Sequence, residues 1–374
     1  MDEHALDAKK SWIALNMVPG VGAVNFRKLL NALGSPEHVF SASISTLMRI
    51  PGIHEKTARK IKQFGFPDHV ARELEAIKTH QVTIITLEDP EYPEQLKTIF
   101  DPPPLLYVKG HPLRRHEPMI AVVGCRKAST YGRTVTEKLC GELAVKGLTV
   151  ISGMARGIDS AAHRGTLKAG GRTIAVLGCG VDVVYPPENT PLYREIIEKG
   201  SVISEFPMHT KPDRGNFPAR NRVISGMSLG TVVVEAGNHS GALITADTAL
   251  EQGRDVFAVP GNVTSAGSKG TNRLIKQGAT LIEHADDVLN ALPLEISREV
   301  QGMQPDLPLL TEPQLPTLTP DEHQIFTLIT HQPIHIDEIT IRAQLPSSQV
   351  SATLMMLEMK NAIRQIAGKM FVRV

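Results

Sequence analysis

The spacing of apolar and polar positions along the chain changes near residue 82. From there to about residue 290, short β-branched or apolar runs alternate with longer amphipathic stretches. Strands separated by single helices form right-handed βαβ units, and the resulting parallel sheet is covered by helices on both faces. We therefore predict an α/β fold, a Rossmann-like domain with a mostly parallel sheet, over residues 81–291. The predicted strands are 82–87, 104–108, 119–124, 148–152, 172–178, 201–205, 231–236 and 255–260, with helices at 131–147, 242–254 and 271–279.

The residues before this domain are patterned as helices, and one loop occurs twice. The stretches 17–30 (MVPGVGAVNFRKLL) and 49–64 (RIPGIHEKTARKIKQF) each carry an apolar residue, Pro, Gly, an apolar residue and then a helix pattern. Tandem loops of this kind are typical of a helix-hairpin-helix (SAM-like) domain, whose hairpins offer main-chain N–H groups to nucleic-acid phosphates. The second copy has His54 where the first has Gly22, which hinders close approach of the backbone. Residues 1–80 are predicted to form this domain, which either contacts nucleic acid or only packs.

The C-terminal part begins with a proline-rich stretch. Residues 292–319 have little periodic hydrophobicity and are predicted to be an extended linker. Three helix patterns and two short strands follow, an order that predicts a winged helix over residues 320–374. Its third helix starts with Ser347, Ser348 and Gln349 and is rich in Met. We therefore expect this helix to read DNA bases only weakly and to serve in protein contact or packing.

Composition and charge narrow the class of protein. The chain has 374 residues, enough for two or three domains, and a formal net charge of +1, so any nucleic-acid contact must come from a local basic patch. Its three cysteines have no CxxC pair and no spacing typical of a zinc site, and no metal or cofactor is predicted. The charged N-terminus and the lack of a run of about 18 apolar residues favour a cytoplasmic protein without membrane contact.

Candidate chemistry gathers where the predicted strands end. Ligands of an open parallel sheet bind beyond the carboxyl ends of its strands, where several glycine-containing loops follow one another in this sequence. Their N–H groups, hydroxyls and guanidinium groups favour an anion, and arginines that bind phosphate and stack on bases suit an extended single strand. Two of the arginines are neighbours on one helix, so one of them is expected to pair with a carboxylate. The candidates are Gly124, Arg126, Ser152, Gly153, Arg156, Gly157, Arg220, Asn221 and Arg222, with hydroxyls of Ser129 and Ser240.

Two rival sites fit these loops less well. The stretch VGCRKASTYG does not match the GxGxxG pattern of dinucleotide-binding domains. A hydrolase could use Glu235, Asp159, Asp182 and His163, but the two aspartates are equally well explained as helix caps or turn residues. The sequence offers no convincing nucleophile, metal cluster or acid–base pair.

Several long motifs carry a resemblance to a known family. VGCRKASTYG, ISGMARGIDSAAHRGTLKAGG, FPARNRVISGMS and VVVEAGNHSGALITADTALEQGRDVFAVPG occur in the order and at the spacing of the DNA-processing protein A family, also called DprA or Smf. The chain resembles this family from about residue 105 to residue 282. Its helical N-terminal part and its C-terminal winged helix also resemble the architecture of the family.

The resemblance implies a function in DNA uptake. It implies a dimeric single-stranded DNA-binding protein, without catalytic residues, that protects incoming strands and loads a RecA-type recombinase during natural transformation. The DNA pocket of the family corresponds here to Arg126, to Ser152, Gly153 and Arg156, and to Arg220, Asn221 and Arg222. Two positions depart from the family, which usually has Ser or Thr at Cys125 and often Ser at Ala242.

The resemblance also leaves an alternative. The central domain is similar to nucleotide phosphoribohydrolases that carry a PGGxGTxxE loop, and the corresponding stretch here reads EAGNHSGALIT. The loss of that carboxylate argues against hydrolysis and leaves nucleotide binding possible. A nucleotide-binding or nucleoside-monophosphate phosphoribohydrolase-like enzyme is therefore the second hypothesis.

Overall fold

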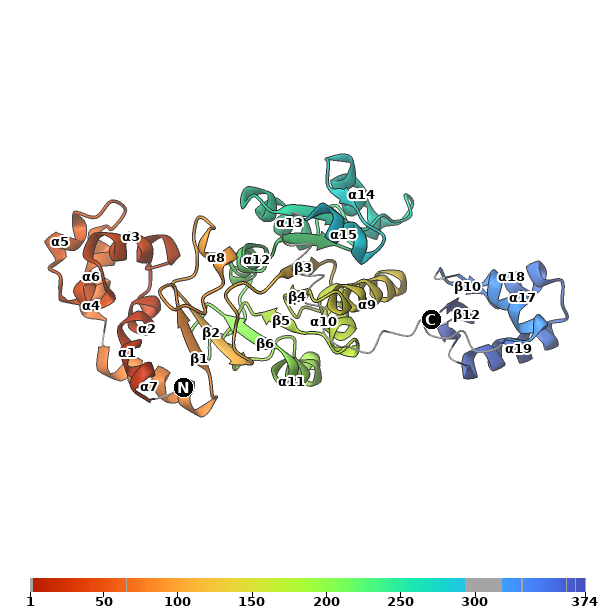
Figure 1. The fold of residues 1–374 in the computed structure, drawn as a ribbon, viewed down its shortest axis with the longest axis horizontal. Coiled ribbons are helices and arrows are strands. Elements are labelled where there is room, and N and C mark those ends of the chain that lie inside the picture. Colours follow the sequence, from red (N-terminus) through yellow and green to blue (C-terminus); the bar gives the residue numbers. More distant parts are fainter. Residues whose placement is uncertain are drawn as a thin grey trace. The chain divides into compact units, whose positions relative to one another are not determined.

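The computed structural model describes residues 3–64, 66–292, 318–330, 332–360, 362–366 and 368–373. The described residues form two compact units (Figure 1). The larger contains an N-terminal group of helices and a nine-stranded sheet, and the smaller contains residues 128–135 and the described residues from 318 onward. Of the predicted linker, residues 293–317 lie outside the described residues.

The repeated Pro-Gly loop in the sequence is also a repeat in the structure. Gly20 and Gly52 both have a positive φ, +96° and +90°, where an L side chain would be strained. Each turn closes with the same hydrogen bond, from Val21 N to Val18 O and from Ile53 N to Ile50 O, both 3.0 Å long. The helices of this part are α1 (Glu3–Ala8), α2 (Lys10–Met17), α3 (Ala23–Leu33), α4 (Pro36–Ser41), α5 (Ile44–Met48), α6 (Glu55–Gln63) and α7 (Phe66–Thr79).

The larger unit has a mostly parallel sheet, as predicted. Its strand order is β1-β2-β6-β5-β4-β3-β7-β8-β9, in which β2 pairs antiparallel with both β1 and β6 and the remaining pairs are parallel. All eight predicted strands are present, whereas β9 was not predicted. The strands are β1 (Thr83–Thr86), β2 (Leu105–Gly110), β3 (Met119–Val123), β4 (Thr149–Ser152), β5 (Thr173–Val176), β6 (Ser201–Ser204), β7 (Gly230–Val233), β8 (Asp255–Ala258) and β9 (Thr280–Leu281).

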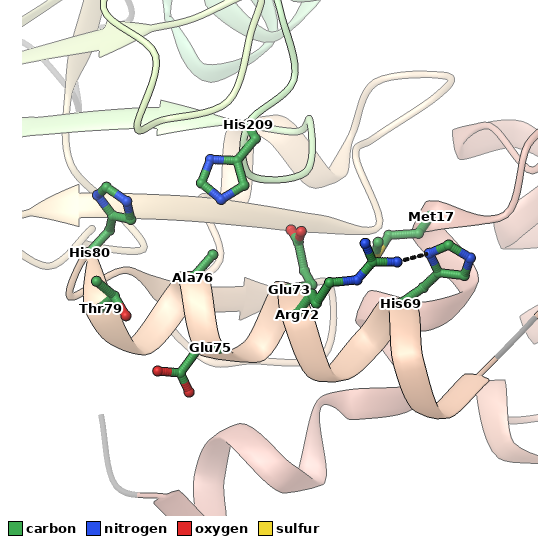
Figure 2. A pocket seen from close by; sticks show the side chains of 9 residues that line it. All are labelled: Met17, His69, Arg72, Glu73, Glu75, Ala76, Thr79, His80 and His209. Carbon is green, nitrogen blue, oxygen red and sulfur yellow. Dashed lines mark hydrogen bonds between the residues drawn. The ribbon is translucent and has the colours of Figure 1, made fainter.

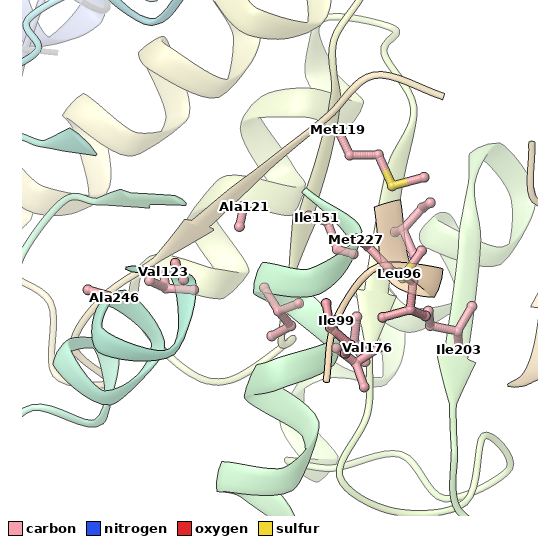
Figure 3. Packing of buried hydrophobic residues seen from close by; sticks show 14 of the residues in the cluster. Leu96, Ile99, Met119, Ala121, Val123, Ile151, Val176, Ile203, Met227 and Ala246 are labelled. Carbon is pink, nitrogen blue, oxygen red and sulfur yellow. The ribbon is translucent and has the colours of Figure 1, made fainter. Parts of the chain in front are cut away.

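Successive residues of a strand point to opposite faces of the sheet, and here apolar residues point to both faces. Helices therefore pack on both faces of this sheet. Ile174 and Val176 lie in one cluster with residues of α8, α12 and α13, while Ala175 and Leu177 lie in another with residues of α10 and α11. Figure 3 shows part of the first cluster, in which Leu96, Ile99 and Met227 pack over the strands. The helices are α8 (Glu94–Lys97), α9 (Thr130–Val145), α10 (Ile158–Lys168), α11 (Thr190–Lys199), α12 (Asn216–Met227), α13 (Gly241–Glu251), α14 (Lys269–Lys276) and α15 (Ala285–Ala291), with 3₁₀ turns η1 (Pro187–Asn189) and η2 (Ala266–Ser268).

The N-terminal helices share a core with one edge of the sheet. Trp12 and Phe26 belong to the same buried cluster as Ile84 of β1 and Tyr107 of β2. Lys9 reaches the first strand, donating from Nζ to Ile84 O at 2.7 Å. This continuous core holds the helical part against the sheet.

The smaller unit is a winged helix with a core of its own. Ile325, Ile339, Leu354 and Phe371 are buried together in it, and its three strands pair in the order β10-β12-β11. Across the described ranges, none of the helices combines the length and the apolar character needed to cross a membrane. The elements are α17 (Pro320–Leu328), β10 (Ile334–His335), α18 (Ile336–Ala343), α19 (Ser347–Met359), β11 (Ile363–Ile366) and β12 (Met370–Arg373).

Candidate nucleic-acid interface

A cleft of about 850 Å³ lies at the carboxyl ends of β3, β4, β5 and β7. The loops that follow these strands line it together with the start of α12, so the structure brings together the segments that the sequence singled out. Four of the lining side chains are cationic, and among them Asp159 supplies a carboxylate. The charged lining consists of Arg126, Lys127, Asp159, Arg214 and Arg220, and the neutral lining includes Gly124, Tyr185, Phe217, Asn221, His239 and Ser240.

Cations and aromatic rings meet at one place in this cleft. The guanidinium carbon of Arg126 lies 5.1 Å from the centre of the Phe217 ring, and that of Arg220 lies 5.9 Å from it. The ring of Tyr185 lies 5.8 Å from that of Phe217, with an angle of 31° between the two planes. Arg126 is exposed and Tyr185 is 37% exposed. A phosphate and a base can therefore be contacted side by side at this point.

Arg220 supports the cleft mainly from within. It is only 5% exposed, and Nη1 donates to Gly153 O at 2.6 Å and to Val176 O. Nε donates to the side-chain oxygen of Asn221 at 3.1 Å. A β-carbon at Gly153 would lie 2.5 Å from Arg220 Nη1, so glycine is required for this approach. Burial lowers the pKa of Arg220, and the nearby Asp159 opposes that change.

An internal carboxylate occupies the place where the sequence suggested a phosphate. At the start of α10, Asp159 accepts a hydrogen bond from Ala155 N at 3.3 Å, and the N–H of Gly153 also faces it. Burial raises the pKa of Asp159, although Arg220 and these N–H groups act to lower it. Ile158 N donates to Cys125 O, and Gly157 has a φ of +78° with that carbonyl directly against it. These N–H groups are used within the protein, so they are not available to a phosphate.

Three other predicted residues are engaged with partners within the protein. The Ser152 hydroxyl is fully buried and donates to Val122 O at 2.6 Å, inside the sheet. Arg222 forms ion pairs with Glu205 and with Asp101, as expected for one of two neighbouring arginines. The Ser152 hydroxyl and the Arg222 guanidinium are therefore engaged within the protein and are not available to a ligand in the cleft. Arg156 is 61% exposed and pairs with Glu188 beside the cleft, next to Tyr185 and Phe217 in a small adjoining hollow.

The groups on which a hydrolase would depend are also engaged. Glu235 is buried, close to Gly267 and to the thiol of Cys125. Burial and this carboxylate raise the pKa of Cys125 to about 12, which keeps the thiol protonated and poorly nucleophilic. His163 is fully buried, and burial lowers its pKa to about 3, so it stays neutral. In the part of the chain that the structure describes, three metal-ligating side chains do not gather at any point.

Sequence reasoning did not single out the aromatic residues of the cleft. Phe217 lies within FPARNRVISGMS, Tyr185 lies in the loop after the predicted strand 172–178, and aromatic residues make up only 4% of the chain. An aromatic residue beside a basic cluster in such a chain is a usable signal for base stacking. Lys127 and Arg214 were also missed: Lys127 lies within VGCRKASTYG, and Arg214 lies just before FPARNRVISGMS.

Three regions of the chain match known families. Residues 83–293 match the family described as DNA recombination-mediator protein A. Residues 310–369 match the DprA winged helix domain, and residues 13–64 match a SAM-like helix-hairpin-helix tandem.

Individual relatives extend these matches over most of the chain. Protein Smf of Synechocystis is 34% identical over 97% of this chain and 98% of its own length. DNA processing protein DprA of Bacillus subtilis is 41% identical over 66% of this chain and 82% of its own length. The structure of DprA from Streptococcus pneumoniae superposes with a TM-score of 0.66 at 33% identity, over 78% of this chain and 99% of that one. DprA of Helicobacter pylori, whose structure concerns a single-stranded DNA binding mode, superposes with a TM-score of 0.50 at 30% identity, over 56% of this chain and 94% of that one.

Proposed function

Because the chain belongs to the DNA recombination-mediator protein A family, we propose that it binds single-stranded DNA in the cleft at the carboxyl edge of the sheet. In this proposal the protein acts by binding and not by catalysis. It protects incoming strands during natural transformation and loads a RecA-type recombinase on them, as a homodimer.

The observation that carries this proposal is the contact of Arg126 with Phe217 beside Tyr185. A guanidinium group that lies against an aromatic ring offers a charge to phosphate and a flat apolar surface to a base within a few ångströms. Lys127 and Arg214 extend the positive charge along the same cleft. Bases in a duplex are stacked and paired, so their faces are available to Phe217 and Tyr185 only in a single strand.

Exposed apolar side chains of the larger unit support the proposed homodimer. Strand β9 is the edge of the sheet, and Leu281 on it is 45% exposed. Leu250 of α13 and Val263 are also large apolar side chains exposed in the larger unit. Apolar side chains of this size favour association with another protein surface. Sedimentation at two protein concentrations tests dimerisation. Loading is tested by measuring the growth of recombinase filaments on single strands that another protein already coats, with and without the chain described here.

Binding to DNA is tested with a labelled thymidine homopolymer and with a duplex of the same length. The wild-type protein should shift the single strand at a concentration at least tenfold lower than the duplex. Phe217→Ala should weaken binding to the single strand by about tenfold, since stacking contributes roughly 1–3 kcal/mol per base. Phe100→Ala removes a 74% exposed aromatic ring outside the cleft and is the matched control. Equal affinity for both DNA forms, or equal effects of the two substitutions, would contradict the proposal.

A further inference from the structure

One segment of the larger unit connects the helical part with the DNA cleft. Residues 205–215 join β6 to α12, and they touch a different partner at each end. Met208 and His209 lie against the helical part, whereas Arg214 lines the cleft and Phe217 follows in the first turn of α12. The conformation of this segment therefore affects the positions of Arg214 and Phe217 in the cleft.

Helix α7 holds the first end. Glu73 accepts a hydrogen bond from Met208 N at 2.8 Å, with the side chain of Met208 buried in the core shared by the helices and the sheet. Figure 2 shows Glu73 extending from α7 toward the loop that carries His209, at a pocket lined also by Glu75 and His80. Burial raises the pKa of Glu73, while the bond from Met208 N acts to lower it. This buried acceptor fixes the main chain of the segment to the helical part.

The next residues are tied to the neighbouring loop. Asp182, in the loop after β5, accepts bonds from His209 N at 2.9 and 3.2 Å and lies 2.6 Å from His209 Nδ1. Gly180 N donates to Thr210 O at 3.0 Å. His209 has a φ of +59°, an uncommon conformation for a residue other than glycine, which persists only where several contacts hold it. The two loops thus form one hydrogen-bonded unit.

Both loops end on the aromatic pair of the cleft. The loop with Asp182 carries Tyr185, and the segment with His209 leads to Arg214 and Phe217. We propose that Glu73 and Asp182 are positioning residues that set the two rings of the DNA cleft, so that the helical part strengthens strand binding without touching the strand. This inference rests on the proposed function, because it concerns the same cleft.

Variants at one helix of the full-length chain test this proposal. Glu73→Ala removes the acceptor of Met208 N, whereas Glu73→Gln keeps a side-chain oxygen in its place. Glu75→Ala changes another carboxylate of α7 that lines the same pocket, and is the matched control. We expect Glu73→Ala to weaken binding of the labelled thymidine homopolymer by about fivefold, with Glu73→Gln and Glu75→Ala within about twofold of the wild type. Asp182→Ala, which removes the acceptor of His209 N, is a second variant with the same expectation as Glu73→Ala.

A double-mutant cycle separates positioning from loss of stability. If Glu73 acts through Phe217, the effect of Phe217→Ala should be smaller by about fivefold in the Glu73→Ala protein than in the wild type. A variant that is only less stable would show the full effect of Phe217→Ala at a temperature where it is folded. Additive effects would therefore overturn the proposal.

Amide exchange provides a measurement that does not depend on DNA. The N–H groups of residues 208–210 and 213–215 should exchange faster in Glu73→Ala than in Glu75→Ala. Unchanged exchange in this segment would overturn the positioning role even if the protein binds DNA. If this segment exchanged faster but the wild-type protein bound no single strand, the proposed function would be contradicted. The hydrogen-bonded contact between Glu73 and the segment would still be supported.

Discussion

At the residue scale, two of the arginines that the sequence assigned to the DNA pocket are expected to behave differently. Arg126 is exposed over the Phe217 ring, whereas the side chain of Arg222 is 13% exposed and pairs with Glu205 and Asp101. Arg126→Ala should weaken binding to the single strand by about tenfold and change the free energy of unfolding by less than about 1 kcal/mol. Arg222→Ala leaves Glu205 without its cation and should lower the free energy of unfolding by about 3 kcal/mol.

Denaturant titration and fluorescence anisotropy measure the two quantities on the same samples. Affinity is compared at denaturant-free conditions in which both variants are folded. If Arg222→Ala weakened binding as much as Arg126→Ala does, Arg222 would belong to the DNA surface after all.

The sequence was informative about which residues gather at the cleft, but not about what each side chain does there. The glycine loops and the FPARNR stretch do meet at the sheet edge. Side-chain direction depends on tertiary neighbours, and those of Ser152 and Asp159 were not visible in the pattern: a sheet carbonyl for the first, and Arg220 and loop N–H groups for the second. The polar character of a loop therefore did not distinguish a surface group from an internal hydrogen bond.

At the scale of single elements, α10 gives the protein a dependence on pH. His163 of this helix is fully buried, with Nδ1 2.7 Å from Thr173 Oγ1 of β5, and burial lowers its pKa from 6.5 to about 3. The unfolded chain takes up a proton at this histidine below about pH 6.5, whereas the folded protein does not. The free energy of unfolding should therefore fall as the pH is lowered, by about 2 kcal/mol from this group near pH 5.

Urea denaturation between about pH 7 and pH 4 tests this expectation. His163→Gln should show a shallower fall with decreasing pH than the wild type. His116→Gln changes an exposed histidine and should keep the wild-type dependence. Parallel pH profiles for wild type and His163→Gln would show that the buried histidine does not control this part of the stability.

The elements themselves were predicted well wherever the pattern was long or the apolar run was continuous. Buried parallel strands such as β3 and β7 are apolar on both faces, and this is visible in the sequence. β9 has two residues, both exposed, so no apolar pattern marks it. The antiparallel pairing of β2 with β6 is a property of chain topology, which periodicity does not encode.

At the scale of the whole molecule, the net charge is small, so the salt dependence of DNA binding should report the number of phosphate contacts in the cleft. With a formal net charge of +1, the protein has little general attraction for DNA, so the charge that matters is that of the cleft. Arg126, Lys127 and Arg214 are exposed there, whereas Arg220 is buried. Three phosphate contacts predict a slope of about −2 in a plot of log affinity against log salt concentration.

The slope is measured by anisotropy titrations of the thymidine homopolymer at several salt concentrations. Lys127→Gln should weaken binding and make the slope less steep by about 0.7, the value of one phosphate on a single strand. Lys199→Gln removes an exposed charge at the end of α11, outside the cleft lining, and should leave the slope unchanged. A slope near zero, or one that both substitutions reduce equally, would mean that affinity does not arise from the cations of the cleft.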